Sequence, residues 1–141
     1  MYVPNQGDII YLTLNPQSGH EQSGRRPVLV ISKYNFNNTT KLAVVCPITN
    51  TERKVPTHVE LKDSGGTTGF VVCEQVKSLD LKTRKPQYKG KIDNDILAEA
   101  IDIVQGFIDL DVVRDEKNGN QPEETFELPE TEMEDTSQAP N

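Results

Sequence analysis

Two arginines stand side by side at the start of an apolar run, in HEQSGRRPVLVIS, residues 20–32. A guanidinium keeps its charge at any physiological pH and presents a planar fork of donors, which suits the oxygens of a phosphate group. Pro27 follows Arg26, and the proline ring pushes the preceding residue into an extended conformation. Since neighbouring side chains on an extended chain point to opposite sides, we expect Arg25 and Arg26 to have different roles, one over the strand face and one outward.

The loop that precedes the arginines allows a functional and a purely structural interpretation. Gly19 and Gly24 bracket HEQS, so the segment reads as a loop anchored on a strand, where binding and catalytic groups often lie. Glu21 is close enough in sequence to fold back onto an arginine. A rim arginine paired with Glu21 or with a loop carbonyl is therefore the alternative to a phosphate-binding arginine, and composition alone favours that alternative.

The elements that must position this loop read as short strands separated by turn signals. Apolar runs at 9–14, 27–32 and 42–48 are expected to form the core, and GFVVCEQVKSLDL, residues 69–81, adds another strand. In PTHVEL, residues 56–61, the alternation predicts that Thr57, Val59 and Leu61 face one way and that His58 and Glu60 face solvent. Short strands with local turns favour a small barrel or a strongly bent antiparallel sheet.

One helix is predicted, late in the chain, in DNDILAEAIDIVQGFIDL, residues 93–110. Apolar residues recur there at steps of three and four, and Asp93 or Asn94 is placed to cap the first turn. Gly106 weakens the last turn by about 1 kcal/mol relative to alanine. The apolar stripe consists of Ile96, Leu97, Ala100, Ile101, Val104, Phe107 and Ile108.

Charge divides the chain into a body and a tail. Residues 1–110 hold 13 Lys and Arg against 12 Asp and Glu, whereas residues 111–141 hold 2 against 10, so the net charge of −7 belongs to the tail. The tail has too few apolar residues to offset chain entropy, and we expect it to be disordered. It is expected either to be an inert solubilising segment or to dock on the basic surface of the body and inhibit it. We therefore predict one domain, residues 1–110.

The remaining composition points away from membranes and metals. No run approaches the roughly 18 apolar residues of a membrane span, and the N-terminus lacks the pattern of a signal peptide, so a cytoplasmic protein is expected. Cys46 and Cys73 lie in apolar runs without metal-ligand spacing. We interpret both as small buried hydrophobic residues and expect neither a metal site nor a cofactor.

The order of the motifs resembles one known family. GDIIYLTLNPQSGHEQSGRRPVLVIS is followed by VVCPIT, VPTHVEL and VVCEQVKSLD, in a pattern that covers roughly residues 3–110. This resembles the MazF/PemK toxin endoribonucleases of type II toxin-antitoxin systems. The resemblance implies a mainly β fold with α, an SH3-like barrel plus a C-terminal helix. It also implies a homodimer that cuts single-stranded RNA without a metal and is silenced by the acidic segment of an antitoxin.

Carried over by position, the resemblance assigns catalytic roles to Arg26, Thr49 and Glu21. The neighbouring ribose 2′-OH attacks phosphorus, giving a 2′,3′-cyclic phosphate and a 5′-OH. Such a reaction needs stabilisation of charge on the phosphoryl oxygens and two proton transfers. Arg26 and Thr49 would stabilise the charge, while Glu21 would orient Arg26 or act as base; the sequence does not assign the proton transfers.

Contacts with RNA are predicted for further residues of the same body. His20 either faces solvent or titrates beside Glu21, and Tyr34 is a candidate base-stacking platform. His58, with no defined partner, is interpreted as a surface residue. The predicted RNA-binding set is Arg25, His20, Lys54, Gln75, Lys77, Arg84 and Tyr34.

Two alternatives remain open at this level. CcdB-like toxins resemble the same architecture but bind DNA gyrase and cut nothing, and the loop with Glu21 and Arg26 argues against that assignment. An inactive or self-inhibited RNA-binding relic is the other alternative.

Overall fold

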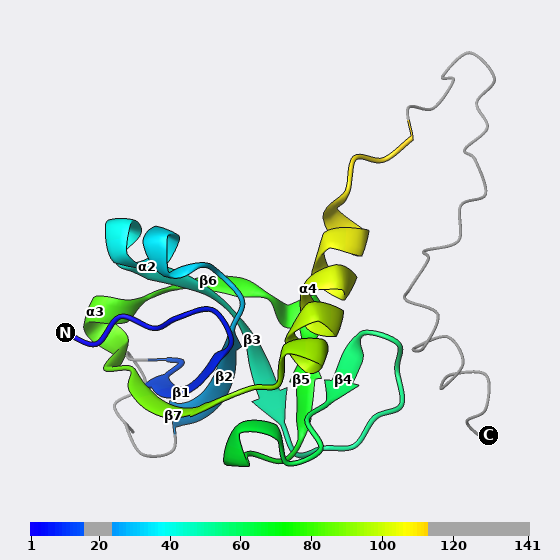
Figure 1. Cartoon of the computed structure of the whole chain (residues 1–141), viewed down its shortest axis with the longest axis horizontal. Coiled ribbons are helices and arrows are strands. Elements are labelled where there is room, and N and C mark those ends of the chain that lie inside the picture. Colours follow the sequence, from blue (N-terminus) through cyan, green and yellow to red (C-terminus); the bar gives the residue numbers. More distant parts are fainter. Residues whose placement is uncertain (16–23, 113–141) are drawn as a thin grey trace.

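The apolar runs of the sequence form neighbouring strands of one antiparallel sheet (Figure 1). The computed structural model describes residues 1–15 and 24–112. The sheet order is β4-β5-β3-β2-β1-β7, and β6 pairs with β3 beside this path. The strands are β1 (Asp8–Thr13), β2 (Arg25–Val30), β3 (Leu42–Thr49), β4 (His58–Glu60), β5 (Phe70–Val72), β6 (Lys77–Asp80) and β7 (Gln87–Lys91).

Strand β3 changes partner along its length and so bends the sheet. Its first half, Leu42 to Val45, pairs with β6, and its last residues, Ile48 and Thr49, pair with β5. Alternate residues then fill two separate apolar clusters, one on each face of the central strands. The bent antiparallel sheet with a C-terminal helix confirms the predicted fold class.

Helix α4 (Asn94–Ile108) covers one of these faces beside β4 and β5 (Figure 1). It begins after Asp93, as predicted, although the Asp93 side chain makes no capping hydrogen bond. The face that it buries consists of Ile96, Ala100, Ile103 and Val104, which pack with Ile9, Leu29 and Cys46. Ile108 was expected in the stripe but is exposed, because the helix runs past the edge of the sheet.

Two short helices and one strand were not predicted, and polar side chains hold the two helices. Helix α2 (Tyr34–Thr40) is fixed by Asn37, whose amide donates to the carbonyls of Pro4 at 2.9 Å and Ser32 at 3.2 Å. Helix α3 (Leu81–Arg84) begins where the Asp80 carboxylate accepts from the Lys82 amide. Strand β7 is an edge strand of mostly exposed residues.

The Gly7-Asp8 pair that opens the family-like pattern anchors the chain start to β7. Asp8 is buried, and its carboxylate accepts from the Tyr2 hydroxyl at 2.5 Å and pairs with the Lys91 ammonium at 2.9 Å. Burial and the bond to Asp8 raise the pKa of Tyr2. Cys46 and Cys73 are buried in the apolar core, as predicted.

We predict that Gly90→Ala destabilises the fold. The 3-10 turn η2 (Ser64–Gly66) rests on β7, and a Cβ at Gly90 would lie 2.1 Å from the Gly65 carbonyl oxygen. The backbone must shift to relieve this clash, and we expect a loss of about 3 kcal/mol in the free energy of unfolding, measured by urea denaturation.

Gly106→Ala is the matched control, because the same methyl group is added at an exposed position of α4. It should stabilise the protein by about 1 kcal/mol through helix propensity. Equal stability of the Gly90→Ala variant and the wild type would contradict the close approach of β7 to η2.

Candidate active site

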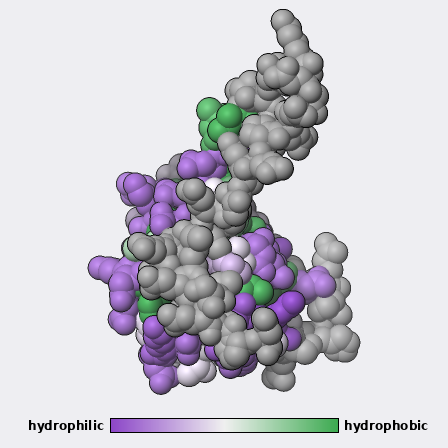
Figure 2. Space-filling view, turned by 90° about the vertical axis from the view of Figure 1, so that its right-hand side faces the viewer, coloured by the Kyte–Doolittle hydropathy of each residue, from purple (hydrophilic) through white to green (hydrophobic). Residues whose placement is uncertain are grey.

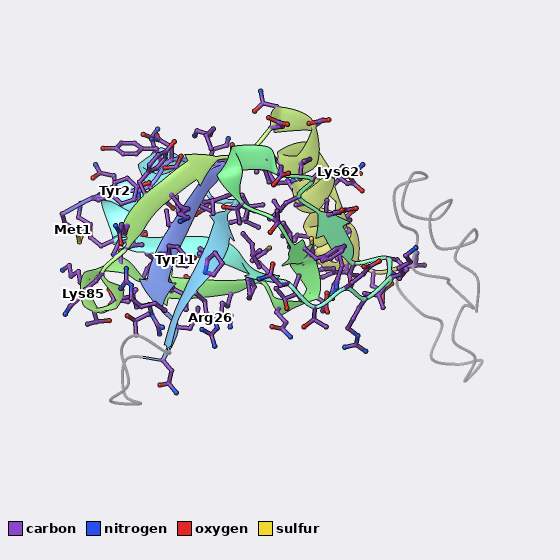
Figure 3. All side chains as sticks on the ribbon, turned by 90° about the horizontal axis from the view of Figure 1, so that it is seen from below. Met1, Tyr2, Tyr11, Arg26, Lys62 and Lys85 are labelled. Carbon is purple, nitrogen blue, oxygen red and sulfur yellow. The ribbon has the colours of Figure 1, made fainter. Side chains whose placement is uncertain are left out.

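Arg26 lies on β2 with its side chain exposed (Figure 3). It stands opposite Leu12 of β1, on the face that carries Val28 and Val30. Among the described residues, its guanidinium donates only to the Arg25 carbonyl, at 3.1 Å. Most of its five donors therefore point at no described protein group, as a ligand for phosphate oxygens requires.

Arg25 points to the opposite face, as the extended conformation before Pro27 predicts. Its guanidinium donates to the carbonyl of Lys85 at 2.9 Å, to the carbonyl of Tyr11 at 3.3 Å and to the Thr13 hydroxyl at 3.3 Å. These bonds direct its donors into the protein. The structure thus separates the two arginines, and the predicted contact of Arg25 with RNA stays a prediction.

Thr49 is the last residue of β3. The β2–β3 pairing ends with Val28 opposite Pro47, and alternation along each strand directs Arg26 and Thr49 to the face that carries Val28 and Pro47. The Thr49 hydroxyl accepts from the Thr51 amide at 3.1 Å. Since a hydroxyl both accepts and donates, this bond leaves the O–H of Thr49 able to donate away from the chain. The predicted pair Arg26 and Thr49 can therefore address one phosphate.

One further predicted residue, Lys77, lies on the same face of the sheet. Lys77 of β6 is opposite Val45, so it shares the face of Thr49, and it is exposed. Val45 and Thr49 are four positions apart on β3, which is about 13 Å at the rise of a strand. Gln75, in the 3-10 turn η3 (Cys73–Gln75) before β6, is also exposed. A positive charge thus lies on the face to which Thr49 points.

The other predicted RNA contacts lie elsewhere. Arg84 of α3 is half-buried and donates to the carbonyls of Thr13, at 3.0 Å, and Leu14. Lys54 is exposed in the segment between β3 and β4. Tyr34 begins α2, which follows the far end of β2, so the structure does not bring it to Arg26 (Figure 1). His20 and Glu21 lie outside the described residues, as do residues 113–141 of the predicted tail.

His58 corrects the prediction from alternation, because it is buried rather than facing solvent. Only 8% of the residue is exposed, and its Nε2 lies 3.0 Å from Glu74 Oε2. The other carboxylate oxygen of Glu74 accepts from the Thr57 hydroxyl at 2.7 Å. Alternation in a three-residue strand cannot reveal a partner 16 residues away, so sequence reasoning missed this pair.

Opposing effects act on the pKa of the Glu74 carboxyl. Partial burial raises it, but hydrogen bonds from Thr57 and His58 lower it more, so the pKa of Glu74 lies below its ordinary 4.5. The carboxylate is therefore the form that joins β4 to η3, next to Gln75.

The described residues contain neither a metal-ligand cluster nor a membrane-spanning helix. Within residues 1–15 and 24–112, no group of three or more His, Cys, Asp or Glu side chains is arranged to hold a metal ion. No helix in that part of the chain is long and apolar enough to cross a membrane.

Comparison with known proteins agrees with this arrangement. Residues 5–108 match the family model described as PemK-like, MazF-like toxin of type II toxin-antitoxin system. The chain belongs to this toxin family. A PemK endoribonuclease of Escherichia coli is 37% identical over 100 residues, which are 68% of this chain and 75% of that protein. The endoribonuclease toxin ChpB of Escherichia coli K12 is 35% identical over 112 residues, 74% of this chain and 93% of the relative.

Solved structures extend the family relation to the fold. A crystal structure of MazF from Deinococcus radiodurans superimposes with a TM-score of 0.69 at 34% identity, covering 78% of this chain and all of that chain. A MazE-MazF crystal structure from the same organism gives 0.70 at 32% identity, with the same coverage. These similarities cover the described body of the chain and place its sheet and helix within the family fold.

We predict that Glu74→Gln lowers stability in a pH-dependent way. A carboxyl whose pKa is lowered by folding contributes stability above its unfolded pKa and loses it as the pH falls through the lower folded value. The difference in unfolding free energy between wild type and Glu74→Gln should therefore be full at pH 6–8 and shrink below about pH 4. Urea denaturation across this range measures it.

Glu60→Gln is the control, because Glu60 is an exposed glutamate on β4, the strand that also carries His58. Its effect on unfolding free energy should be within about 0.5 kcal/mol of zero. A Glu74→Gln effect that persists unchanged at low pH would show that the carboxylate charge is irrelevant to the contact between β4 and η3.

Proposed function

We propose that this protein is an endoribonuclease toxin that cleaves single-stranded RNA without a metal. The observation that carries the proposal is the exposed guanidinium of Arg26 at the start of β2, the neighbour of the strand β3 that ends at Thr49. The family relation supports the same activity, because curated relatives are named endoribonucleases. It favours this function over the gyrase-binding alternative.

The chemistry follows from what the two groups can donate. The 2′-oxygen of the ribose attacks the adjacent phosphorus, the bond from phosphorus to the 5′-oxygen breaks, and a 2′,3′-cyclic phosphate and a 5′-OH result. Negative charge grows on the non-bridging oxygens during attack, and fixed donors are worth most where charge develops. Arg26 supplies a charged fork and Thr49 a single O–H.

The proton balance needs one group to accept the 2′ proton and another to supply a proton to the departing 5′-oxygen. We propose that Glu21, carried over from the family loop pattern, orients Arg26 or accepts the 2′ proton. His20 is its neighbour in the chain and is proposed to contact the RNA. Both positions stay proposals, since they lie outside the described residues.

The RNA strand is proposed to follow the exposed face from Arg26 and Thr49 toward Gln75 and Lys77. Lys77 adds a positive charge on that face, and Lys54 lies five residues after Thr49 on an exposed segment. A strand held by several cations releases counterions when it binds, so KM should rise steeply with salt.

We predict that Arg26→Ala lowers kcat at least about a hundredfold, as expected when a donor to developing charge is removed. The assay follows cleavage of a single-stranded RNA in EDTA, with the ends of the products identified as cyclic phosphate and 5′-OH.

Arg26→Lys is the matched control, because it keeps the charge and removes the planar fork. We expect it to retain binding of an uncleavable oligonucleotide while recovering only part of the lost rate. Full activity of Arg26→Ala would overturn the mechanism, and absence of cleavage by the wild type would overturn the function.

We propose two protein partners for this toxin. Solved relatives include MazE-MazF structures. The first proposed partner is therefore a cognate antitoxin, whose acidic segment covers the basic face of Arg26 and Lys77.

The second proposed partner is another copy of the chain. At the end of α4, Ile108, Leu110 and Val112 are exposed, Leu110 to 96%, and Figure 2 shows exposed hydrophobic atoms at the height where α4 ends. Apolar surface of this kind favours self-association.

We predict that the double variant Ile108→Glu, Leu110→Glu shifts the protein from twice the chain mass to a single chain mass. Two carboxylates placed in an apolar contact remain unpaired and oppose its burial. Light scattering on a gel-filtration column measures the mass, and Gln105→Glu, a charge added at another exposed position of α4, should leave a dimer. A double variant that keeps twice the chain mass would exclude this contact.

A further inference from the structure

The strand end that carries Arg26 has fewer ladder partners than the rest of β2. Pairing of β2 with β3 stops at Val28 opposite Pro47, and pairing of β1 with β7 stops at Tyr11 opposite Gln87. Among the described residues, β1 and β2 pair from there only with each other, through Leu12 opposite Arg26 and Thr13 opposite Arg25. We call residues 12–14 and 24–26 the terminal ribbon. A two-stranded ribbon alone is marginally stable in water.

Two guanidinium groups bind the terminal ribbon where strand partners are missing. Arg25 donates from one face to the carbonyl of Tyr11 and, across to the turn after α3, to the carbonyl of Lys85. Arg84 donates to the carbonyls of Thr13 and Leu14, the last residues of the ribbon on the β1 side. The Leu14 amide in turn donates to the Gly24 carbonyl at 3.0 Å. The two arginines thus tie both strands of the ribbon to the segment after α3.

The guanidinium of Arg84 donates to these carbonyls and is only partly exposed to solvent. It is half-buried, and its Nε is buried without a hydrogen-bond partner among the described residues. A buried donor without a partner costs free energy, so the arginine is not placed there as an ordinary surface cation. Its Nη1 donates to the carbonyls of Thr13 and Leu14, which lie beyond the last residue of β1 that pairs with β7.

We propose that Arg84, together with Arg25, is a positioning residue that holds the terminal ribbon and so fixes Arg26 against the scissile phosphate. Arg84 then acts through the backbone of β1 and does not contact RNA, unlike the role that its basic character suggests from sequence. The inference rests on the proposed endoribonuclease function and deepens it. A reacting group displaced by about 1 Å can cost two orders of magnitude in rate, so a loosened ribbon should lower kcat.

The experiment compares Arg84→Gln with Lys82→Gln, which removes the same charge from an exposed position of the same helix. Cleavage of a single-stranded RNA is measured at several salt concentrations. We expect Arg84→Gln to lower kcat on the order of tenfold or more, while its KM and the salt dependence of KM match those of Lys82→Gln. Amide hydrogen exchange should speed up at residues 12–14 and 25–26 in Arg84→Gln alone.

A phosphate contact gives a different result. If Arg84 binds RNA, the slope of log KM against log salt falls by about 1 relative to Lys82→Gln and kcat is kept, which overturns the proposal. Reduced thermal stability with a normal kcat for the folded fraction overturns it too, since Arg84 would then serve the fold only. Cleavage by the wild type and its loss in Arg26→Ala test the function separately from these outcomes.

Thr13→Val keeps the proposal testable if Arg84→Gln fails to fold. This variant removes the hydroxyl that Arg25 Nη1 contacts at 3.3 Å and changes no charge. We expect kcat to fall on the order of fivefold, the scale of one lost hydrogen bond, with the salt dependence of KM unchanged. An unchanged kcat together with unchanged hydrogen exchange in the terminal ribbon would overturn the proposal that Arg25 and Arg84 hold the ribbon in place.

Discussion

The alternation of neighbouring side chains along an extended strand divides the work between Arg25 and Arg26. Pro27 holds the chain extended, so the two guanidinium groups leave β2 on opposite faces. One binds carbonyls of β1 and of the segment after α3, and the other stays exposed. The site therefore depends on a conformational restriction imposed by a residue that takes no part in chemistry.

Strand β3 changes partner along its length and ends at Thr49, the second residue of the predicted catalytic pair. Its first residues pair with β6 and its last with β5, while its pairing with β2 ends at Pro47 opposite Val28. Within residues 1–15 and 24–112, Arg26 therefore has a ladder partner on the β1 side and none on the β3 side. The end of the β2–β3 ladder thus coincides with the position of the exposed guanidinium.

Sequence alone could predict the central strands, the late helix and the opposite directions of Arg25 and Arg26, because these follow from periodicity and from steric restriction at Pro27. The catalytic pairing of Arg26 with Thr49 stays a prediction that rests on resemblance to a family, since 23 positions separate the residues. The alternation of side chains along β4 predicts that His58 faces solvent. The side chain is buried instead, because it forms a hydrogen bond with Glu74. Charge alone could not reveal the partners of Arg84, because its bonds to the carbonyls of Thr13 and Leu14 join residues about 70 positions apart.

Arg84 and Lys85, which contact the terminal ribbon, each carry an energetically unfavourable feature. Lys85 has a φ of +50°, in the left-handed region that costs a residue with a Cβ about 1 kcal/mol or more, and its carbonyl accepts from Arg25. Its neighbour Arg84 buries Nε without a partner among the described residues. Two unfavourable features in consecutive residues persist only when surrounding contacts determine them, and here both residues supply bonds to the strands that carry Arg26. The protein thus gives up stability beside the site, and the result is an exposed guanidinium on a strand end that cannot fray freely.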